Sequence, residues 1–115
     1  MRKDDRIRFL HMLEAAKEAL GFTKNKTEVD LSRDRMLILS VVKDIEIIGE
    51  AASKISKECQ QQYPEIPWPR IIGMRNRLIH VYFDIDFRQV WQTIATDLPG
   101  LVAQLEKIIS ETDPS

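Results

Sequence analysis

The feature that most constrains the fold is an apolar repeat in the second third of the chain. Its members are spaced alternately three and four residues apart, which is the heptad pattern of a helix that buries one seam. The repeat comprises Ile38, Val41, Ile45, Ile48, Ala52, Ile55 and Cys59. Further apolar residues away from this seam are Leu37, Ile47 and Ala51. The pattern predicts one long helix, capped by Asp30 or Ser32 and ended before Pro64, that is central in a bundle or lies at a dimer interface.

A first helix is predicted over about residues 4–20. Asp4 or Asp5 can cap its start, and Gly21 suits its end. Its apolar stripe comprises Ile7, Leu10, Leu13, Ala16 and Leu20. The spacing of this stripe is helical.

Two more helices are predicted beyond the Pro-rich connector of residues 64–69. The third covers roughly residues 69–81, and Trp68, just before it, is expected in the core. The fourth is capped near Asp86 and keeps helical register across Pro99, which predicts a kinked helix or two nearly collinear ones.

The fold class that follows is all-α, an up-and-down bundle of four to five helices. No stretch alternates apolar and polar residues with the period of a β-strand. The 115 residues fit one domain with one core, which we expect over residues 1–110, with a frayed tail over residues 111–115.

Composition excludes several classes of protein. The net charge of −1 gives no overall basic field for coating nucleic acid. No apolar run is long enough to span a membrane, and the first residues do not resemble a secretory signal. The single cysteine, Cys59, permits no internal disulfide and continues the apolar heptad, so we interpret it as a core residue. We therefore expect a cytoplasmic protein.

One short segment is locally basic. Arg70, Arg75, Arg77 and His80 fall within eleven residues that contain no acid. On a helix, Arg75, Asn76, His80 and Tyr82 lie on one side, opposite an apolar side of Met74, Leu78 and Val81. Arginine can stabilise phosphate charge and histidine can move a proton near neutral pH. Spacing alone leaves the alternative open that these are ordinary solvated side chains.

The residues around this segment carry a more specific pattern. Arg75, His80 and Tyr82 form R-x4-H-x-Y, preceded by Ile66-Pro-Trp68. Ile48-Gly-Glu-Ala51 lies upstream, and Asp86-Phe-Arg-Gln-Val-Trp91 lies downstream. Together these motifs resemble the HepT-type toxins of the HEPN superfamily, over nearly the whole chain.

The resemblance implies a metal-independent endoribonuclease with no cofactor, the toxin of a type VII toxin–antitoxin system, that acts as a homodimer on RNA. Arg75 and His80 would be the catalytic pair, and the products a 2′,3′-cyclic phosphate and a 5′-hydroxyl. Asn76 would support Arg75. The partner implied is a minimal nucleotidyltransferase antitoxin of the MntA type, which would adenylylate Tyr82.

Other candidates remain. Glu46 and Glu50 lie one turn apart, and either could pair with Arg75, although a solvated face is equally consistent; Glu50 is the candidate supporting residue. Arg70 and Arg77 are candidate RNA-binding residues. Two histidines without a matched carboxylate cluster do not predict a metal site. The alternative functions are a non-catalytic HEPN module that binds a nucleotide or partner and scaffolds a nucleotidyltransferase, and a plain dimerising helical module.

Overall fold

The structure, a computed structural model, describes residues 1–78 and 84–112. Within these ranges the regular elements are helices and none is a β-strand, which confirms the expected all-α bundle. The elements are α1 (Lys3–Phe22), α2 (Glu28–Arg33), α3 (Arg35–Ser53), α4 (Lys57–Gln62), α5 (Trp68–Ile72), α6 (Met74–Leu78), α7 (Phe87–Gln92), a π-helical turn η1 (Thr93–Asp97) and α8 (Leu98–Glu111). No described helix is long and apolar enough to cross a membrane.

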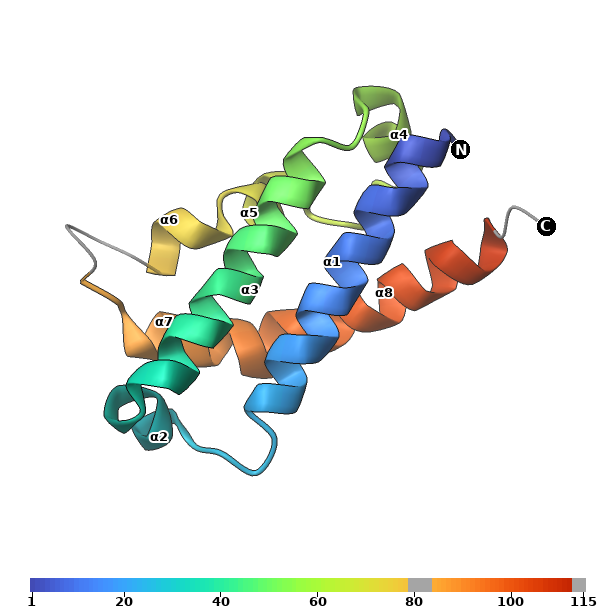
Figure 1. The fold of residues 1–115 in the computed structure, drawn as a ribbon. Coiled ribbons are helices and arrows are strands. Elements are labelled where there is room, and N and C mark those ends of the chain that lie inside the picture. The colour runs from blue at the N-terminus through green and yellow to red at the C-terminus, as the bar shows by residue number, and fades with distance from the viewer. Residues whose placement is uncertain (79–83, 113–115) are drawn as a thin grey trace.

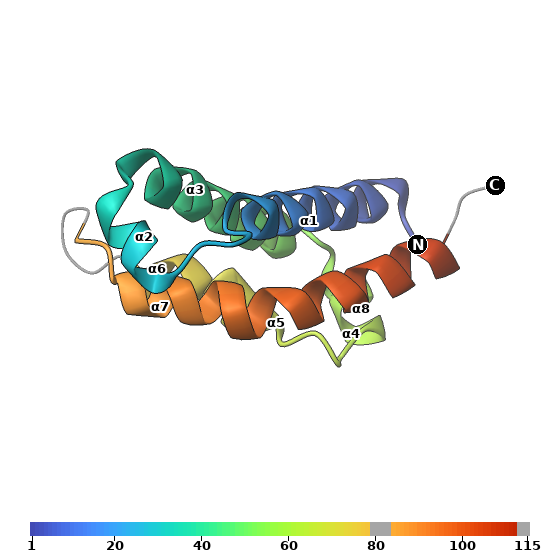
Figure 2. The same cartoon turned by 90° about the horizontal axis from the view of Figure 1, so that it is seen from below.

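The helices form two layers around one core. The long helices α1 and α3 lie side by side (Figure 1), and α7, η1 and α8 run beneath them as one rod (Figure 2). Of the short helices, α5 and α6 pack against α3, and α6 also contacts α7. The largest fully buried side chains come from both layers and include Phe9, Met12, Ile45, Ile48, Leu98 and Leu105. The fold thus consists of three long rods joined by short helical turns.

Helix α1 covers the predicted range but buries a partly different stripe. Its buried apolar residues are Phe9, Met12, Ala15, Ala16 and Ala19, whereas Ile7 is exposed. Three alanines on the buried side allow α3 and α8 to approach closely. Of the predicted stripe, Ala16 is fully buried and Leu13 and Leu20 pack partly buried against the core, so the prediction was wrong for Ile7 and missed Phe9 and Met12.

The capping expected for α1 was also wrong. The cap position is Arg2, and the helix continues past Gly21 to Phe22. Asp5 is instead buried and accepts two hydrogen bonds of 2.8 Å, from the backbone N–H and the hydroxyl of Ser56. Asp5 therefore ties α1 to the start of α4.

This tie explains why the heptad is not one helix. Helix α3 ends at Ser53 and α4 begins at Lys57, although Ile55 and Cys59 are both buried as the repeat predicts. The Ser56 hydroxyl caps α4 by accepting from the Cys59 N–H. Since Asp5 holds the Ser56 backbone, the helical pattern is interrupted while the apolar residues still face the core.

The start of α3 also differs from expectation. Neither Asp30 nor Ser32 caps it, since both lie within α2. The cap is Asp34, whose carboxylate accepts from the Leu37 N–H at 3.0 Å.

The predicted third helix is divided at Gly73. The Gly73 N–H closes α5 on the Pro69 carbonyl, and the Gly73 carbonyl accepts from the Asn76 N–H in α6. Trp68 lies in the core as expected and donates its indole N–H to the carbonyls of Gln60 and Tyr63. The described part of the segment is thus two short helices rather than one.

The last helix matches the prediction closely. The Asp86 carboxylate caps α7 by accepting from the Gln89 N–H at 3.0 Å. The chain remains helical through η1 and across Pro99, which occupies the first turn of α8 where a missing N–H is tolerated. The π-helical turn is the local adjustment that keeps the rod continuous.

Candidate functional site

Helix α6 presents Arg75 at the surface. Met74 and Leu78 of the same helix are fully buried, whereas Arg75 and Asn76 are exposed. The separation of an apolar and a polar side is thus confirmed for the part of the motif that the structure describes. The other two motif residues, His80 and Tyr82, belong to residues 79–83, outside the described ranges.

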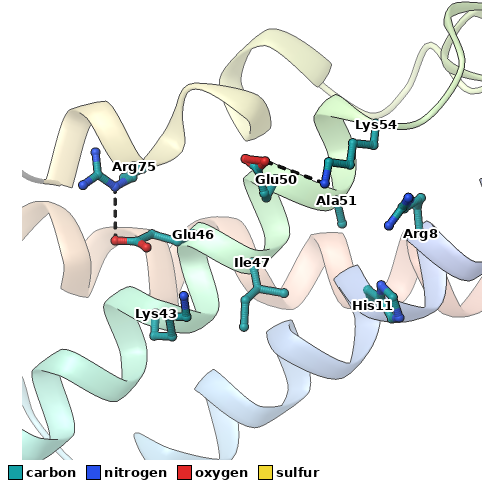
Figure 3. Close-up of a pocket in the computed structure, with 9 residues that line it drawn as sticks. All are labelled: Arg8, His11, Lys43, Glu46, Ile47, Glu50, Ala51, Lys54 and Arg75. Carbon is teal, nitrogen blue, oxygen red and sulfur yellow. Dashed lines mark hydrogen bonds and ion pairs between the residues drawn. The ribbon is translucent and has the colours of Figure 1, made fainter.

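Arg75 is held by a carboxylate from α3. Its Nε donates to Oε1 of Glu46 at 3.1 Å (Figure 3). The Arg75 side chain is 51% exposed and that of Glu46 is 32% exposed, so the guanidinium is oriented yet remains accessible. Of the two acids that sequence left open as partners of Arg75, Glu46 is the one the structure pairs with it.

The position of α6 relative to α3 depends on Gly49. A β-carbon there would lie 3.3 Å from the carbonyl oxygens of both Ile71 and Ile72, at the end of α5. Only a residue without a side chain permits this approach without a shift of the backbone. Gly49 lies one turn after Glu46, so the contact brings the chain that leads into α6 beside the carboxylate that holds Arg75.

Arg75 lies at the edge of a groove of about 410 Å³ between α1, α3 and α6 (Figure 3). Its lining residues are Arg8, His11, Lys43, Glu46, Ile47, Glu50, Ala51, Lys54 and Arg75. Glu50 pairs with Lys54, which follows the last residue of α3, at 4.0 Å. We refer to this pocket as the α1–α3 groove.

Apart from Arg75, sequence reasoning missed the Lys and Arg residues of this groove, which are Arg8, Lys43 and Lys54. Lys43, Ile47, Glu50 and Lys54 follow one another at four, three and four residues, so they share one side of α3. This spacing could have predicted that these side chains lie together. Nothing in the sequence could have placed Arg8 beside them, because only the packing of α1 against α3 brings Arg8 into the groove.

Arg70 and Arg77, the other two arginines of the basic segment, do not share the Glu46 contact of Arg75 but bond to other groups. Arg70 forms an ion pair with Asp97 of η1, with contacts of 3.1 and 3.2 Å to its two carboxylate oxygens. Arg77 donates to the Arg70 carbonyl at 3.1 Å. The structure therefore places Arg70 and Arg77 beside each other and does not bring Arg70 into the α1–α3 groove with Arg75.

Two further ionisable groups are buried. Burial, and after it the charge of Asp5, raises the pKa of the Cys59 thiol to about 11, in keeping with its interpretation as a core residue. Asp44 of α3 is 2% exposed, and one of its carboxylate oxygens has no hydrogen-bond partner among the described residues. Burial, and after it the neighbouring Glu18 carboxylate, raises the pKa of Asp44 to about 7. Within the described part of the chain, no group of three His, Cys, Asp or Glu side chains could hold a metal ion.

Comparison with known proteins identifies the class. The family model described as "Ribonuclease HepT-like" matches residues 12–108. The chain is 37% identical over 114 residues to "Putative RNase MJ1216" of Methanocaldococcus jannaschii, an alignment that covers 98% of this chain and 94% of the relative. It is 38% identical over 87 residues to "Probable ribonuclease HepT" of Thermococcus cleftensis, covering 76% of this chain and 79% of the relative. No solved structure matches at a significant level.

The chain belongs to the HepT-like ribonuclease family of the HEPN superfamily. This membership agrees with the all-α bundle and supports a ribonuclease of the HEPN type.

Proposed function

We propose that this protein is the toxin of a type VII toxin–antitoxin system, a metal-independent endoribonuclease that acts as a homodimer. The observation that carries the proposal is the Arg75–Glu46 pair at the edge of a basic groove, in a chain of a ribonuclease family. A guanidinium held by one nitrogen still offers its other N–H groups to phosphate oxygens.

The proposed reaction is an internal phosphoryl transfer. The ribose 2′-oxygen attacks the adjacent phosphorus as its proton is removed, and the bond from phosphorus to the 5′-oxygen breaks as that oxygen takes up a proton. His80 transfers one of these protons, and Arg75 stabilises the charge of the phosphorane-like transition state. The products are a 2′,3′-cyclic phosphate and a 5′-hydroxyl, and no metal is required.

The remaining candidate residues have supporting parts in this proposal. Asn76, next to Arg75 on the exposed side of α6, orients the substrate. Glu50 supports the site through its pairing with Lys54 on the wall of the groove. Arg70 and Arg77 bind RNA on the side of α5 that faces η1.

We propose that control comes from a minimal nucleotidyltransferase antitoxin that adenylylates Tyr82. A tethered nucleotide adds a phosphodiester charge with which Arg75 can pair in place of the RNA phosphate. The modification would therefore block substrate without unfolding the bundle.

Dimer formation is supported by apolar surface on α3. Met36 is 81% exposed and Leu39, one turn further along, is 46% exposed, so the two leave adjoining apolar surface uncovered at the start of α3. Light scattering should give a mass of twice the 13.4 kDa of the chain. A single 13.4 kDa species at micromolar concentration would contradict the homodimer.

The experiment that tests the activity is cleavage of RNA by the purified chain in the presence of EDTA. Arg75→Ala and His80→Ala should each lower kcat/KM by roughly a hundredfold or more, the usual effect of losing a charge-stabilising or proton-transferring group. Arg2→Ala is a matched control, since it removes another exposed Arg–Glu pair, with Glu58, outside the groove. A folded protein that binds RNA and leaves it intact would favour the non-catalytic module instead.

A further inference from the structure

The α1–α3 groove carries more positive charge than the chain as a whole. Two of its cations are already paired, Arg75 with Glu46 and Lys54 with Glu50. Arg8 and Lys43 also line it, and neither forms an ion pair with a carboxylate of the described residues. The groove thus has two cations in excess on a chain whose net charge is −1.

These cations come from both walls of the groove. Arg8 is a half-buried residue of α1, and Lys43 is an exposed residue of α3. Figure 3 shows Arg8 on the α1 side and Lys43 and Arg75 on either side of Glu46. A concave surface lined by one sign of charge concentrates its field on ligands of the opposite sign.

The length of the groove suits a polymer rather than a single phosphate. Lys43 and Lys54 are eleven residues apart on or just after α3, which corresponds to roughly 16 Å of helix. Successive phosphates of a stacked strand are spaced about 3.4 Å along its axis, so the groove covers several of them.

The lining offers little surface on which bases could stack. Its described residues include no Phe, Tyr or Trp; His11 carries their one aromatic ring, and Ile47 is their one large apolar side chain. Stacking platforms in single-strand binding are aromatic, whereas lysine and arginine contact the phosphates. Because four cationic side chains of the described residues line the groove beside this single ring, RNA binding here should depend mainly on charge rather than on base sequence.

We propose that the α1–α3 groove is the track for the RNA strand that flanks the cut site, with Arg8 and Lys43 contacting its phosphates. The proposal rests on the ribonuclease function proposed above and adds to it a binding surface on α1 and α3. A strand whose phosphate lies at Arg75 would continue between the two helices, past Lys43 on one wall and Arg8 on the other.

The test separates binding from cleavage. Single-stranded RNA with a fluorescent label is titrated with the full-length His80→Ala protein, so that no cleavage occurs, at several salt concentrations. In this background the double change Arg8→Gln and Lys43→Gln should weaken binding roughly tenfold at about 0.1 M salt, for any RNA sequence. It should also make the slope of log K against log salt shallower by about 1.4, the loss of two single-strand phosphate contacts.

The control is Lys57→Gln with Lys107→Gln, two exposed lysines on α4 and α8 that do not line the groove. This control variant removes the same amount of positive charge as the groove variant. Its affinity for RNA should stay within about twofold of that of the His80→Ala protein. If the double groove variant is unstable, Lys43→Gln alone changes an exposed residue and should shift the slope by about 0.7.

The outcomes distinguish the two proposals. Suppose that the wild type cuts RNA but the groove variant binds RNA as tightly as the control variant does. The proposed RNA-binding role of the groove is then wrong, and the proposed ribonuclease activity is unaffected. If RNA is bound through Arg8 and Lys43 but never cut, the track stands as a binding site and the catalytic proposal fails. If the groove variant keeps its affinity for RNA and loses its dimer or its binding to an acidic protein partner, the groove is a protein interface and the track is wrong.

Discussion

A β-carbon at Gly49 would lie 3.3 Å from the carbonyl oxygen of Ile71, so α3 and α5 meet backbone to backbone at this position. The neighbour is a backbone atom, which cannot rotate away as a flexible side chain can. This approach sets the distance between α3 and the chain that leads into α6, and therefore whether Glu46 reaches Arg75.

We expect Gly49→Val to destabilise the fold by about 1–3 kcal/mol, the usual cost of forcing extra atoms into a packed interior. Gly21→Val is the matched control, because that glycine is also helical but a β-carbon there would meet nothing within 4 Å. Thermal unfolding by circular dichroism measures both. Equal melting temperatures for the two variants would show that α5 can move away without cost.

Glu46→Gln should lower kcat for RNA cleavage several-fold, because Arg75 loses the charged partner that orients it. KM should not rise, since the groove also loses a negative charge. Steady-state kinetics with a short RNA separates the two effects. Glu58→Gln, which removes the partner of Arg2, is the control and should change neither constant. An unchanged kcat for Glu46→Gln would mean that the pair does not position Arg75 for the reaction.

Asp44 should make the stability of the fold depend on pH. Its pKa is about 7 in the folded protein against 3.8 as the ordinary value. Between these pH values the folded state binds more protons than the unfolded state, so stability falls as pH rises from about 4 to 7 and stays low above that. Asp44→Asn keeps the shape without the charge. It should raise the melting temperature at pH 8 and leave it nearly unchanged at pH 4.

Glu18→Gln provides a second measurement of the same effect, since the Glu18 carboxylate contributes to the raised pKa of Asp44. It should also raise the melting temperature at pH 8, by less than Asp44→Asn does. If the difference between wild type and Asp44→Asn is the same at pH 4 and pH 8, Asp44 is not titrating in this range.

Asp5→Ala should destabilise the protein by about 1–3 kcal/mol, because it leaves the half-buried Ser56 N–H and hydroxyl without the acceptor that the buried Asp5 carboxylate provides. Asp4→Ala changes the neighbouring residue, which is exposed, and should alter stability by less than about 0.5 kcal/mol. Urea denaturation gives both values. A small effect of Asp5→Ala would show that water replaces the carboxylate at Ser56.

Tyr82→Phe should retain RNase activity and escape neutralisation by a co-expressed, active nucleotidyltransferase, because the substitution removes only the acceptor oxygen. Tyr63→Phe is the control at the chain's other tyrosine, which packs edge-on against Phe9, and it should remain neutralised. Mass spectrometry of the wild type should find one or more AMP-sized adducts on the peptide containing Tyr82. An unmodified peptide from a fully neutralised complex would point to inhibition by simple binding.

Local sequence determined the helical character of this protein and several of its details. Residues spaced three and four apart bury one side of any helix they form, which is why Ile38, Ile45 and Ile48 are buried as expected. A carboxylate before a helix satisfies its first N–H groups, so Asp86 caps α7. The same local geometry separates exposed Arg75 from buried Met74.

Only the tertiary structure decided which distant groups meet. The heptad continues past Ser53 in sequence, but the carboxylate of Asp5 holds Ser56 and interrupts the helix. Glu46 and Glu50 were equivalent candidates by spacing, and the close approach at Gly49 brings Arg75 to Glu46. Periodicity reports which side of a helix is apolar, whereas the pairing of two helices depends on the shapes of both surfaces, and that information is not contained in either segment alone.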